Sequence, residues 1–434
     1  NGPGQIGVAG STLSYGGAAI GTVSGGANGS NLRIDFTSTA ATVEAVEALI
    51  QHLGYRNADS SPTTTRSLAL RVADGDGGTS EPSTLTVNIT QSLDGTPTAH
   101  GEERINSHTP GNQHWPSAAT LADGSYVVTW QSDGSQDGSG WGIYAQRFAS
   151  NGEVIGPELR VNTLAGGNQS WAQVAALSTG GYVITWQDDG ANDGSGYGVY
   201  GQRFDAGGSA LGSQFLINTT TSGNQYQGNV AAYDSGFAAV WSTGSDIYLQ
   251  RFTNDGARLG AETLVSTVPG GAGAQGGPQY LPDVAAWSNG NFIVVWADGS
   301  PNDSSETGVY GRLYDAGTGS FGSSFLVNTT TVSYQSFYAN EEHAPNVAVL
   351  ANGDFVVVWP SYQQDSGSTW GVIGQRFDAS GNKLGGEFIV NETTAGSQYQ
   401  PEVTALSTGG FVVSFYNDNY DISGSGTTAD VYIR

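Results

Sequence analysis

The chain has 434 residues, no cysteine and no methionine, and a formal net charge of −25 at pH 7. An excess of negative charge this large repels nucleic acid and anionic membranes, so we expect no nucleic-acid partner and no direct membrane insertion. The absence of cysteine excludes a disulfide framework, thiol catalysis and zinc–thiolate sites.

Residues 1–96 do not share the pattern of the rest of the chain. Their strand-like runs surround a single helical candidate, Ala41–Tyr55, in which apolar residues recur at helical spacing after a Thr/Ser cap. This pattern predicts a small immunoglobulin- or cadherin-like β-sandwich with one short helix. Residues 97–101, in a segment rich in Gly, Pro and Thr, are predicted to be a linker.

A repeat fills residues 102–434. Runs such as GGYVVTW end in an aromatic residue at spacings of 56, 55, 55, 63 and 56 residues: Trp130, Trp186, Trp241, Trp296, Trp359 and Phe415. Each unit holds four short β-rich runs separated by Gly and Asn turns, and one unit alone is too short to bury a core. The repeat therefore predicts an all-β fold, a β-propeller, rather than a string of small sandwiches.

The two ends of the repeat region are incomplete units that complement each other. The last unit stops at Asp430–Arg434 without a fourth strand, whereas Glu102–Asn106 matches the fourth-strand pattern of Glu158–Asn162 without preceding strands. Pairing of these ends would make six blades and remove an exposed sheet edge. The sequence predicts a six-bladed ring closed in this way.

Acidic loops follow most of the repeated aromatic residues, as in WQSDGSQDGSGWG. Carboxylates, hydroxyls and Gly carbonyls are the hard oxygen ligands that Ca²⁺ prefers. The alternative is that Asp-Gly segments only form turns by capping their own backbone. The predicted calcium ligands are Asp133, Asp137, Asp189, Asp193, Asp298 and Asp303 in the repeats, and Asp74 and Asp76 in the first domain.

Departures from the repeat predict a ligand site on the loop-rich face. The third unit lacks the acidic loop, and the connections into the fourth and fifth units are enlarged. Aromatic rings and carboxylates in the last connection suit stacking and hydrogen bonding to a glycan or peptide. The predicted ligand-binding residues are Tyr334, Phe337, Tyr338, Glu341, Glu342 and His343.

The sequence carries no serine-elbow or helical metalloprotease motif, so no catalytic residue is predicted. Arginines that recur in the strands of the repeat are expected to make structural ion pairs rather than to bind a ligand. They are Arg147, Arg203, Arg251, Arg312 and Arg376.

Two segments resemble a known class of protein. The stretch ALIQHLGYRNADSSPTTTRSLALRVADGDGGTS is similar to cadherin-like modules, and the GGYVVTWQ…GVYGQRFD unit is similar to repeats, of large secreted RTX-type bacterial adhesins. The glycine-rich calcium nonapeptides of that class are missing from this chain. The resemblance implies a secreted or cell-surface location and a role in attachment.

These observations predict a calcium-stabilised binding module of a bacterial adhesin that recognises a glycan or another surface ligand. A structural or self-assembling spacer of a surface or matrix protein is the alternative. A polysaccharide-degrading enzyme is the third possibility, because propellers also carry such activities.

Overall fold

The structure is a computed structural model in which the chain divides into two compact units, residues 1–103 and 104–434. It describes residues 6–24, 32–43, 45–46, 49, 65–70, 83–88, 104–133, 136, 138–164, 166–266, 277–299, 307–331, 333–336, 344–365, 369–392, 394–419 and 428–434. No helix among these residues is long and apolar enough to cross a membrane.

The first unit contains one four-stranded antiparallel sheet and one separate strand pair. The sheet runs in the order β1 (Ile6–Ala9), β2 (Thr12–Tyr15), β3 (Ala18–Ser24) and β4 (Arg33–Phe36). The pair consists of β5 (Thr65–Leu70) and β6 (Ser83–Asn88). This unit is β-rich as predicted, while the immunoglobulin- or cadherin-like sandwich stays a prediction.

The predicted helix is present where its residues are described. Residues 43, 45, 46 and 49 are helical, and the hydroxyl of Thr42 accepts a hydrogen bond from the N–H of Ala45 at 3.3 Å. Thr42 is thus the N-cap, and it lies inside the predicted span, whereas the sequence predicts a Thr/Ser cap before Ala41. Ala45 and Leu49 pack with Leu13 and Ile20 of the sheet, which explains the helical spacing of the apolar residues.

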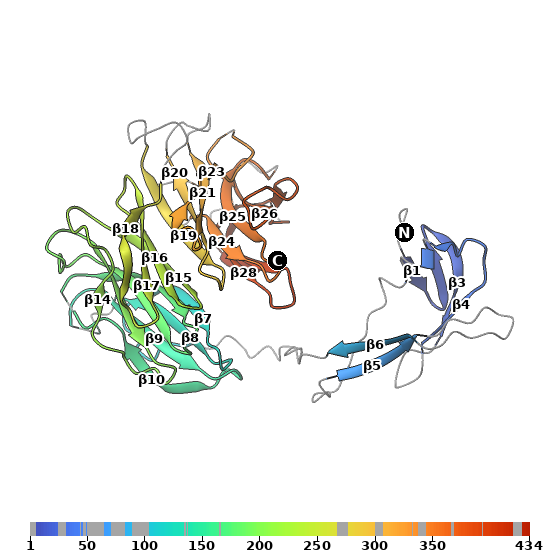
Figure 1. The fold of residues 1–434 in the computed structure, drawn as a ribbon, viewed down its shortest axis with the longest axis horizontal. Helices are drawn as coiled ribbons and strands as arrows, with labels where there is room; N and C mark the ends of the chain where they lie inside the picture. The colour runs from blue at the N-terminus through green and yellow to red at the C-terminus, as the bar shows by residue number, and fades with distance from the viewer. Residues whose placement is uncertain are drawn as a thin grey trace. The chain divides into compact units, whose positions relative to one another are not determined.

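The second unit is a succession of antiparallel sheets in chain order (Figure 1). The first comprises β7 (Gln113–Thr120), β8 (Tyr126–Ser132), β9 (Gly142–Phe148) and β10 (Val154–Arg160). The second comprises β11 (Gln169–Ala176), β12 (Tyr182–Asp188), β13 (Gly198–Phe204) and β14 (Phe215–Leu216). The third comprises β15 (Tyr226–Tyr233), β16 (Gly236–Ser242), β17 (Ile247–Thr253) and β18 (Arg258–Leu264).

The later sheets follow the same plan. The fourth comprises β19 (Gln279–Ala286), β20 (Phe292–Asp298), β21 (Gly308–Asp315), β22 (Ser320–Phe321) and β23 (Phe325–Leu326). The fifth comprises β24 (Asn346–Val349), β25 (Phe355–Tyr362), β26 (Trp370–Phe377) and β27 (Phe388–Ile389). The sixth comprises β28 (Ser397–Ala405), β29 (Phe411–Asn419) and β30 (Thr428–Ile433).

The first strand of each sheet lies innermost. Each of these inner strands contacts the next, in the order β7, β11, β15, β19, β24 and β28. This is the radial arrangement of a β-propeller, and it confirms the predicted all-β propeller fold. Small and apolar residues of the VAAL type allow the inner strands to approach one another, as the sequence indicates.

Five apolar cores hold the sheets together, and each joins two sheets that are consecutive in the chain. The repeated tryptophans are the largest members of four of these cores, and Trp186, Trp296 and Trp359 are completely buried. An aromatic pair such as Tyr182–Phe204, with ring centroids 4.9 Å apart, recurs from sheet to sheet. The periodic aromatic residues of the sequence therefore pack consecutive sheets against each other.

The sixth sheet has no fourth strand among the described residues. Residues 104–106 form no strand, and residues 102 and 103 lie outside the described part of the chain. The ring is thus not closed by the predicted pairing in this structure. Closure by Glu102–Asn106 beside Asp430–Arg434 stays a prediction.

Candidate functional site

A β-bulge near the start of the inner strands sets the geometry of the propeller mouth. In β7 the register shifts between His114 and Ser117, and the same shift recurs in β11, β15, β19 and β28. The bulge holds Trp115 and Trp171 at φ values of 48° and 61°. The N–H of Trp171 donates to Oε1 of Gln131 at 3.0 Å. A bulge re-aims the side chain that it carries, so the scaffold presents whatever residue stands there.

Four aromatic rings gather at this mouth in the first two sheets. We name His114, Trp115, Trp141 and Trp171 the mouth aromatic cluster. Trp115 stacks on Trp171 with centroids 4.9 Å apart and an interplanar angle of 19°. Trp141 lies 6.3 Å from Trp115 and 6.4 Å from His114. His114 is exposed and the three tryptophans are half-buried, so the cluster offers ring surface to a ligand.

The aromatic lining continues toward the third sheet. Tyr197, just before β13, lies 5.3 Å from Tyr226 at the start of β15. The Asn224 amide donates to the Tyr226 hydroxyl at 2.6 Å, which fixes that ring. Trp141 and Tyr197 occupy the same place in their sheets, directly before the Gly that opens the third strand. The type of aromatic residue therefore differs between the two sheets, while its position in the sheet is the same.

A row of polar side chains follows the bulges along the inner strands. The Ser117 hydroxyl donates to Gln173 Oε1 at 3.1 Å, and the Asn346 amide donates to Glu402 Oε2 at 2.9 Å. Each of these bonds joins one sheet to the next. We name this set the inner polar row: Ser117, Gln173, Asn229, Asp283, Asn346 and Glu402.

Asp283 is the buried acid of this row. Its Oδ1 accepts hydrogen bonds from the Asn229 amide and from the N–H of Val284, and its Oδ2 accepts from the N–H of Val347. Its side chain is only 6% exposed. Burial raises the pKa of Asp283 to about 7, which outweighs the hydrogen bonds from Val347 and Val284. Asp283 can therefore hold a proton near neutral pH.

Glu402 is the second acid of the row and differs from Asp283 in being exposed. Dense surroundings and then the charge of Asp283 raise the pKa of its carboxyl above the usual range, against the hydrogen bond from Asn346. Two acids that influence each other this way can act as a proton donor and a proton acceptor.

The predicted calcium ligands Asp133 and Asp189 are engaged by amides. The N–H of Asn112 donates to Asp133 Oδ1, and its side-chain amide donates to Oδ2 at 2.9 Å. Asn168 makes the same pair of bonds to Asp189, at 2.5 and 2.8 Å. These contacts tie the acidic loop to the preceding connection, and the donors occupy oxygens that a cation would need. Calcium at these two residues stays a prediction.

The other predicted metal ligands are separated or lie outside the described residues. Asp193 accepts a hydrogen bond from the N–H of Ser195 at 3.1 Å, and Asp298 is buried at the end of β20. No group of three or more acidic or His side chains with metal-site geometry occurs among the residues that the structure describes. The predicted ligands outside the described ranges are Asp74, Asp76, Asp137 and Asp303.

Only Tyr334 of the predicted ligand-binding residues is described. Its ring lies 6.5 Å from Trp370 of β26, and its carbonyl accepts from the N–H of Tyr362 at 3.0 Å. Tyr334 therefore packs on the fifth sheet. The remaining predicted residues of this sector lie outside the described part of the chain: Phe337, Tyr338, Glu341, Glu342 and His343.

The repeated arginines make structural contacts, but mostly not the expected ion pairs. Arg147 donates to the carbonyl of Gly207 at 2.7 Å, and Arg203 donates to the carbonyl of Asp255. Of the five, Arg376 has a carboxylate partner, Asp354 at 3.4 Å. The arginine side chains reach the turn of the next sheet, so backbone carbonyls of that turn accept their hydrogen bonds in place of carboxylates.

Sequence reasoning missed the mouth aromatic cluster. The segments GNQHW and GNQSW run into the first residues of two inner strands, β7 and β11, and repeat the same polar-aromatic pattern. Without the bulge, the alternation of a strand does not reveal that both tryptophans turn toward each other. The inner polar row was missed because its members differ in chemistry from sheet to sheet.

Comparison with known proteins gives structural neighbours only. No family model matches the chain, and no curated protein matches it. A protein of unknown function from Dyadobacter fermentans gives a TM-score of 0.49 at 12% identity, covering 75% of this chain and 96% of its own. The NanB sialidase of Streptococcus pneumoniae gives 0.48 at 9% identity, with coverages of 74% and 67%. An α-L-arabinofuranosidase from Fusarium graminearum gives 0.47 at 14% identity, with coverages of 74% and 92%.

These neighbours correct the prediction of a calcium-stabilised adhesin module. Where they carry a functional name, it is that of a glycosidase, a class of carbohydrate-processing enzyme, and not that of an adhesin. The adhesin prediction is therefore wrong on this comparison. It rested on acidic loops, and in the structure Asn112 and Asn168 occupy the carboxylates of two of those loops. With TM-scores below 0.5, the neighbours do not assign an activity to this chain.

Proposed function

We propose that this protein is a carbohydrate-processing propeller that takes a sugar ring at the mouth aromatic cluster. The observation that carries the proposal is the gathering of three half-buried tryptophans and an exposed histidine at the start of β7 and β11. Indole rings present broad apolar faces to the C–H faces of a sugar. The neighbouring inner polar row supplies amides, a hydroxyl and carboxyls that can bind sugar hydroxyls.

The composition of the mouth favours a neutral sugar over an anionic polymer. Asp283 and Glu402 contribute the only ionisable groups of the inner polar row, and the whole chain has a formal charge of −25. An anionic ligand would meet repulsion here, whereas a neutral sugar meets ring faces and hydrogen-bonding groups.

Titration of tryptophan fluorescence with a panel of neutral oligosaccharides tests this proposal. We expect saturable quenching with at least one member, and at least tenfold weaker binding for Trp141→Ala. Trp370→Ala is the matched control, because Trp370 stands at the same position of the fifth sheet and contacts Tyr334 and Tyr362. Equal binding by the wild type and Trp141→Ala would overturn the proposal.

Hydrolysis of a glycosidic bond is the second candidate, favoured by the two coupled acids. In our proposal the exposed Glu402 donates a proton to the leaving oxygen as the glycosidic bond breaks, water adds to the anomeric carbon, and the proton that this water releases returns to the Glu402 carboxylate. The charge of Asp283 favours the protonated form of Glu402 before the reaction. Asn346 orients the Glu402 carboxyl through its amide.

A reducing-sugar assay over the same oligosaccharides separates binding from hydrolysis. We expect Glu402→Gln to abolish product release while leaving fluorescence quenching in place. Because a raised pKa keeps the acid protonated toward neutral pH, activity should fall as pH rises through that pKa. Binding without any product would leave the first proposal and remove the second.

We also propose that the propeller closes into six blades with residues 102–106 as the outer strand of the sixth sheet. Asn106 donates to the carbonyl of His108 at 2.6 Å and to Gln113 Oε1 at 3.0 Å. Asn162, which follows the outer strand of the first sheet, makes the equivalent bonds to Leu164 and Gln169, both at 2.8 Å. The contacts around Asn106 thus match those of Asn162, a residue that follows an outer strand, and this match supports the proposal.

The sixth sheet has a matching unoccupied edge. By the strand register, Val431 corresponds to Ile143 of the first sheet. Val431 is 79% exposed, whereas Ile143 is fully buried against its outer strand. Pairing Ile105 with Val431 would bury both. Because the chain has no cysteine, an Ile105→Cys/Val431→Cys pair should form an intramolecular disulfide under oxidising conditions, detected by mass spectrometry. Reduced thiols in the folded protein would end this proposal.

Calcium binding, a secreted location, the likeness to RTX-type modules and self-association remain further proposals. For calcium, the test is a thermal melt in millimolar calcium against excess chelator. Unscreened carboxylates would lower the melting temperature in chelator if Asp133, Asp137, Asp189 or Asp193 bound an ion. Superimposable melts would show that the acidic loops are turns only.

A further inference from the structure

Equivalent grooves separate the outer strands of neighbouring sheets, away from the inner strands. The groove between the first and second sheets holds a cavity of about 160 Å³, and that between the third and fourth sheets holds one of about 330 Å³. We name them the first groove and the third groove. The third groove is lined mainly by Leu249, Arg251, Arg312, Tyr314, Ser320 and Phe321.

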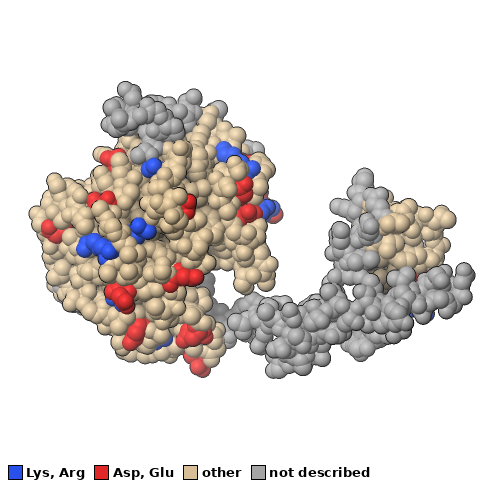
Figure 2. Space-filling model, viewed as in Figure 1, with Lys and Arg blue, Asp and Glu red and all other residues tan. Residues whose placement is uncertain are grey.

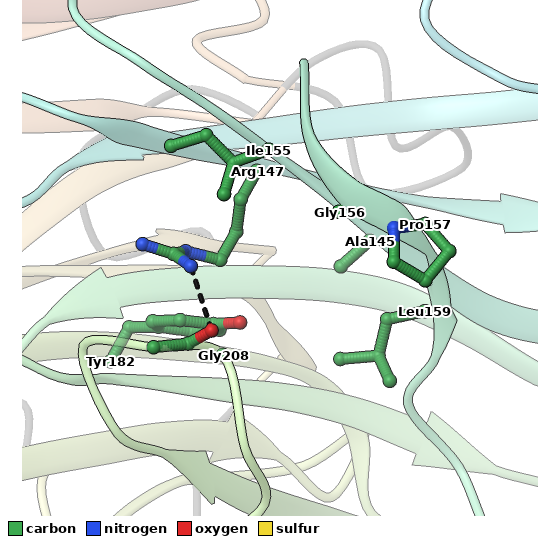
Figure 3. A pocket seen from close by; sticks show the side chains of 9 residues that line it. Ala145, Arg147, Ile155, Gly156, Pro157, Leu159, Tyr182 and Gly208 are labelled. Carbon is green, nitrogen blue, oxygen red and sulfur yellow. Dashed lines mark hydrogen bonds between the residues drawn. The ribbon is translucent and has the colours of Figure 1, made fainter.

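In the first groove the arginine is bonded to the scaffold through one guanidinium nitrogen. Figure 3 shows the guanidinium of Arg147 reaching toward the turn of the second sheet beside the ring of Tyr182, with its 2.7 Å bond to the Gly207 carbonyl drawn. Arg203 makes the same type of contact one sheet later, to the carbonyl of Asp255. Arg147 and Arg203 thus follow one rule, in which the arginine bonds to a carbonyl at the turn of the next sheet.

The fourth sheet breaks the rule through its sequence. The segment GQRFD of the second sheet is GRLYD here, so Arg312 stands where Gln202 stands and Leu313 stands where Arg203 stands. Arg312 donates through Nε to the Gly322 carbonyl at 2.7 Å and through Nη1 to the Val265 carbonyl at 2.8 Å. The substitution brings a second guanidinium into the third groove.

Arg251, the other arginine of the third groove, has no hydrogen-bond partner among the described residues. Its guanidinium lies over the ring of Tyr314, 4.8 Å from the centroid, instead of reaching a carbonyl as Arg147 does. The Tyr314 side chain is 5% exposed, and its hydroxyl has no hydrogen-bond partner within the described structure. The Arg251 guanidinium and the Tyr314 hydroxyl thus line one cavity, and neither has a hydrogen-bond acceptor among the described residues.

None of the described residues that line the third groove is acidic, although the chain has 39 acidic and 14 basic residues. On the face drawn in Figure 2, acidic and basic side chains are scattered rather than gathered into one patch of either sign. A local pair of arginines without carboxylates is therefore a departure from the charge pattern of the protein.

We infer that the third groove is a binding site for a small carboxylate. The guanidinium of Arg251 can donate two parallel hydrogen bonds to a carboxylate, and the Tyr314 hydroxyl can donate a third. Arg312 adds positive charge while keeping its bonds to two carbonyls, and Phe321 under it offers an apolar wall, 5.0 Å from the guanidinium. One uncommitted guanidinium matches a monoanion better than a phosphate dianion.

This inference goes beyond the carbohydrate mouth, because the third groove lies among outer strands and shares no residue with the mouth aromatic cluster. The two sites can therefore be tested independently.

Ligand-observed NMR with acetate, benzoate and glucuronate at low ionic strength tests the site, with glucose as the uncharged counterpart of glucuronate. We expect saturation transfer to at least one carboxylate and none to glucose through this groove. Arg251→Gln should weaken that carboxylate at least tenfold, and Tyr314→Phe, which keeps the ring, should weaken it severalfold. Arg203→Gln is the matched control and should leave carboxylate binding unchanged.

Thermal melts of each variant establish that the fold is intact before binding is compared. No transfer to any carboxylate, or equal binding by the wild type and Arg251→Gln, would overturn the inference. Equal loss in Arg203→Gln would also overturn it, by pointing to a general effect of charge. Preferential binding of inorganic phosphate over every carboxylate would overturn the assigned ligand class.

Discussion

The same strands contribute to the cores between the sheets and to the mouth of the propeller, but the two regions differ in whether their side chains recur from sheet to sheet. In the cores, the same residue types recur in sheet after sheet, with Trp186, Trp241 and Trp296 in one position and stacked aromatic pairs in another. At the mouth, one bulge position carries Trp, Trp, Gln, Leu and Gln in turn. The backbone is repeated in both regions, but the side chains are repeated only in the cores.

This difference distinguishes residues that stabilise the fold from residues that can contact a ligand. A residue that recurs at a fully buried position is explained by packing alone. A residue that varies at a fixed and partly exposed position, such as Trp141 against Tyr197, needs another reason. The mouth aromatic cluster and the third groove are both found by this criterion.

The sharpest test of the comparison is a pair of tryptophan truncations. Trp186→Ala should lower the free energy of unfolding by about 3–5 kcal/mol, because it opens a cavity in a fully buried core. Trp141→Ala should lower it by less than about 1 kcal/mol, because the half-buried ring leaves space that water can fill. Urea unfolding followed by circular dichroism measures both.

Similar losses in the two variants would contradict the division into core and mouth. In that case Trp141 would serve packing, and the carbohydrate proposal would lose its main observation.

Much of the fold follows from the sequence because packing is periodic. The spacing of Trp130, Trp186 and Trp241 marks one strand in each sheet, and each buries the same face. The helical spacing after Thr42 likewise identifies a helix that packs on Leu13 and Ile20. These features depend on local pattern and burial, which a sequence displays directly.

The site was harder to predict, for physical reasons. Trp115 and Trp171 meet because a bulge turns them together, and a bulge leaves no mark in the alternation of residues. The partners of Asp283 come from strands more than fifty residues away on either side. Acidic loops drew attention to calcium, whereas Asn112 and Asn168 show that amide donors from a neighbouring connection can account for their carboxylates.

The seam between the sixth and first sheets tests whether the core pattern extends around the ring. In a closed ring Ile105 becomes a core residue equivalent to Val161, which is 2% exposed. Ile105→Ala should then lower the free energy of unfolding by about 2 kcal/mol. Ile155→Ala, at an exposed outer-strand position, should change it by less than about 0.5 kcal/mol. Equal, small effects in urea unfolding would mean that the seam stays open.

The inner polar row should reveal itself in the pH dependence of stability. Burial raises the pKa of Asp283 to about 7, so the folded protein keeps a proton that the unfolded chain releases near pH 4. Its contribution to stability is full below about pH 4, falls as pH rises to about 7, and is level above that. Asp283→Asn should flatten this slope, while losing about 1–2 kcal/mol at low pH because the amide nitrogen cannot accept a hydrogen bond.

Glu262 supplies the control, because the pKa of its carboxyl is lowered whereas that of Asp283 is raised. Burial acts to raise the pKa of its carboxyl, but hydrogen bonds from Thr219 and Thr220 outweigh it and lower the pKa. Glu262→Gln should therefore remove stability that the wild type loses as pH falls through the lowered pKa. Urea unfolding between pH 3 and pH 8 compares the slopes. An unchanged slope in Asp283→Asn would show that this acid is ionised throughout.

The smallest predicted difference compares two arginines at one repeated position. Arg147→Gln loses a 2.7 Å bond to the Gly207 carbonyl, so we expect unfolding to become easier by about 0.5–1.5 kcal/mol. Arg251→Gln loses no hydrogen bond to the described residues, and its contact with the Tyr314 ring is worth at most about 1 kcal/mol at a partly exposed site. In the absence of ligand, Arg251→Gln should thus be the milder change.

A saturating carboxylate should stabilise the wild type and Arg147→Gln but not Arg251→Gln, because a ligand stabilises only the state that binds it. Differential scanning calorimetry with and without the carboxylate measures both effects, and a larger loss in Arg251→Gln without ligand would make that residue part of the scaffold.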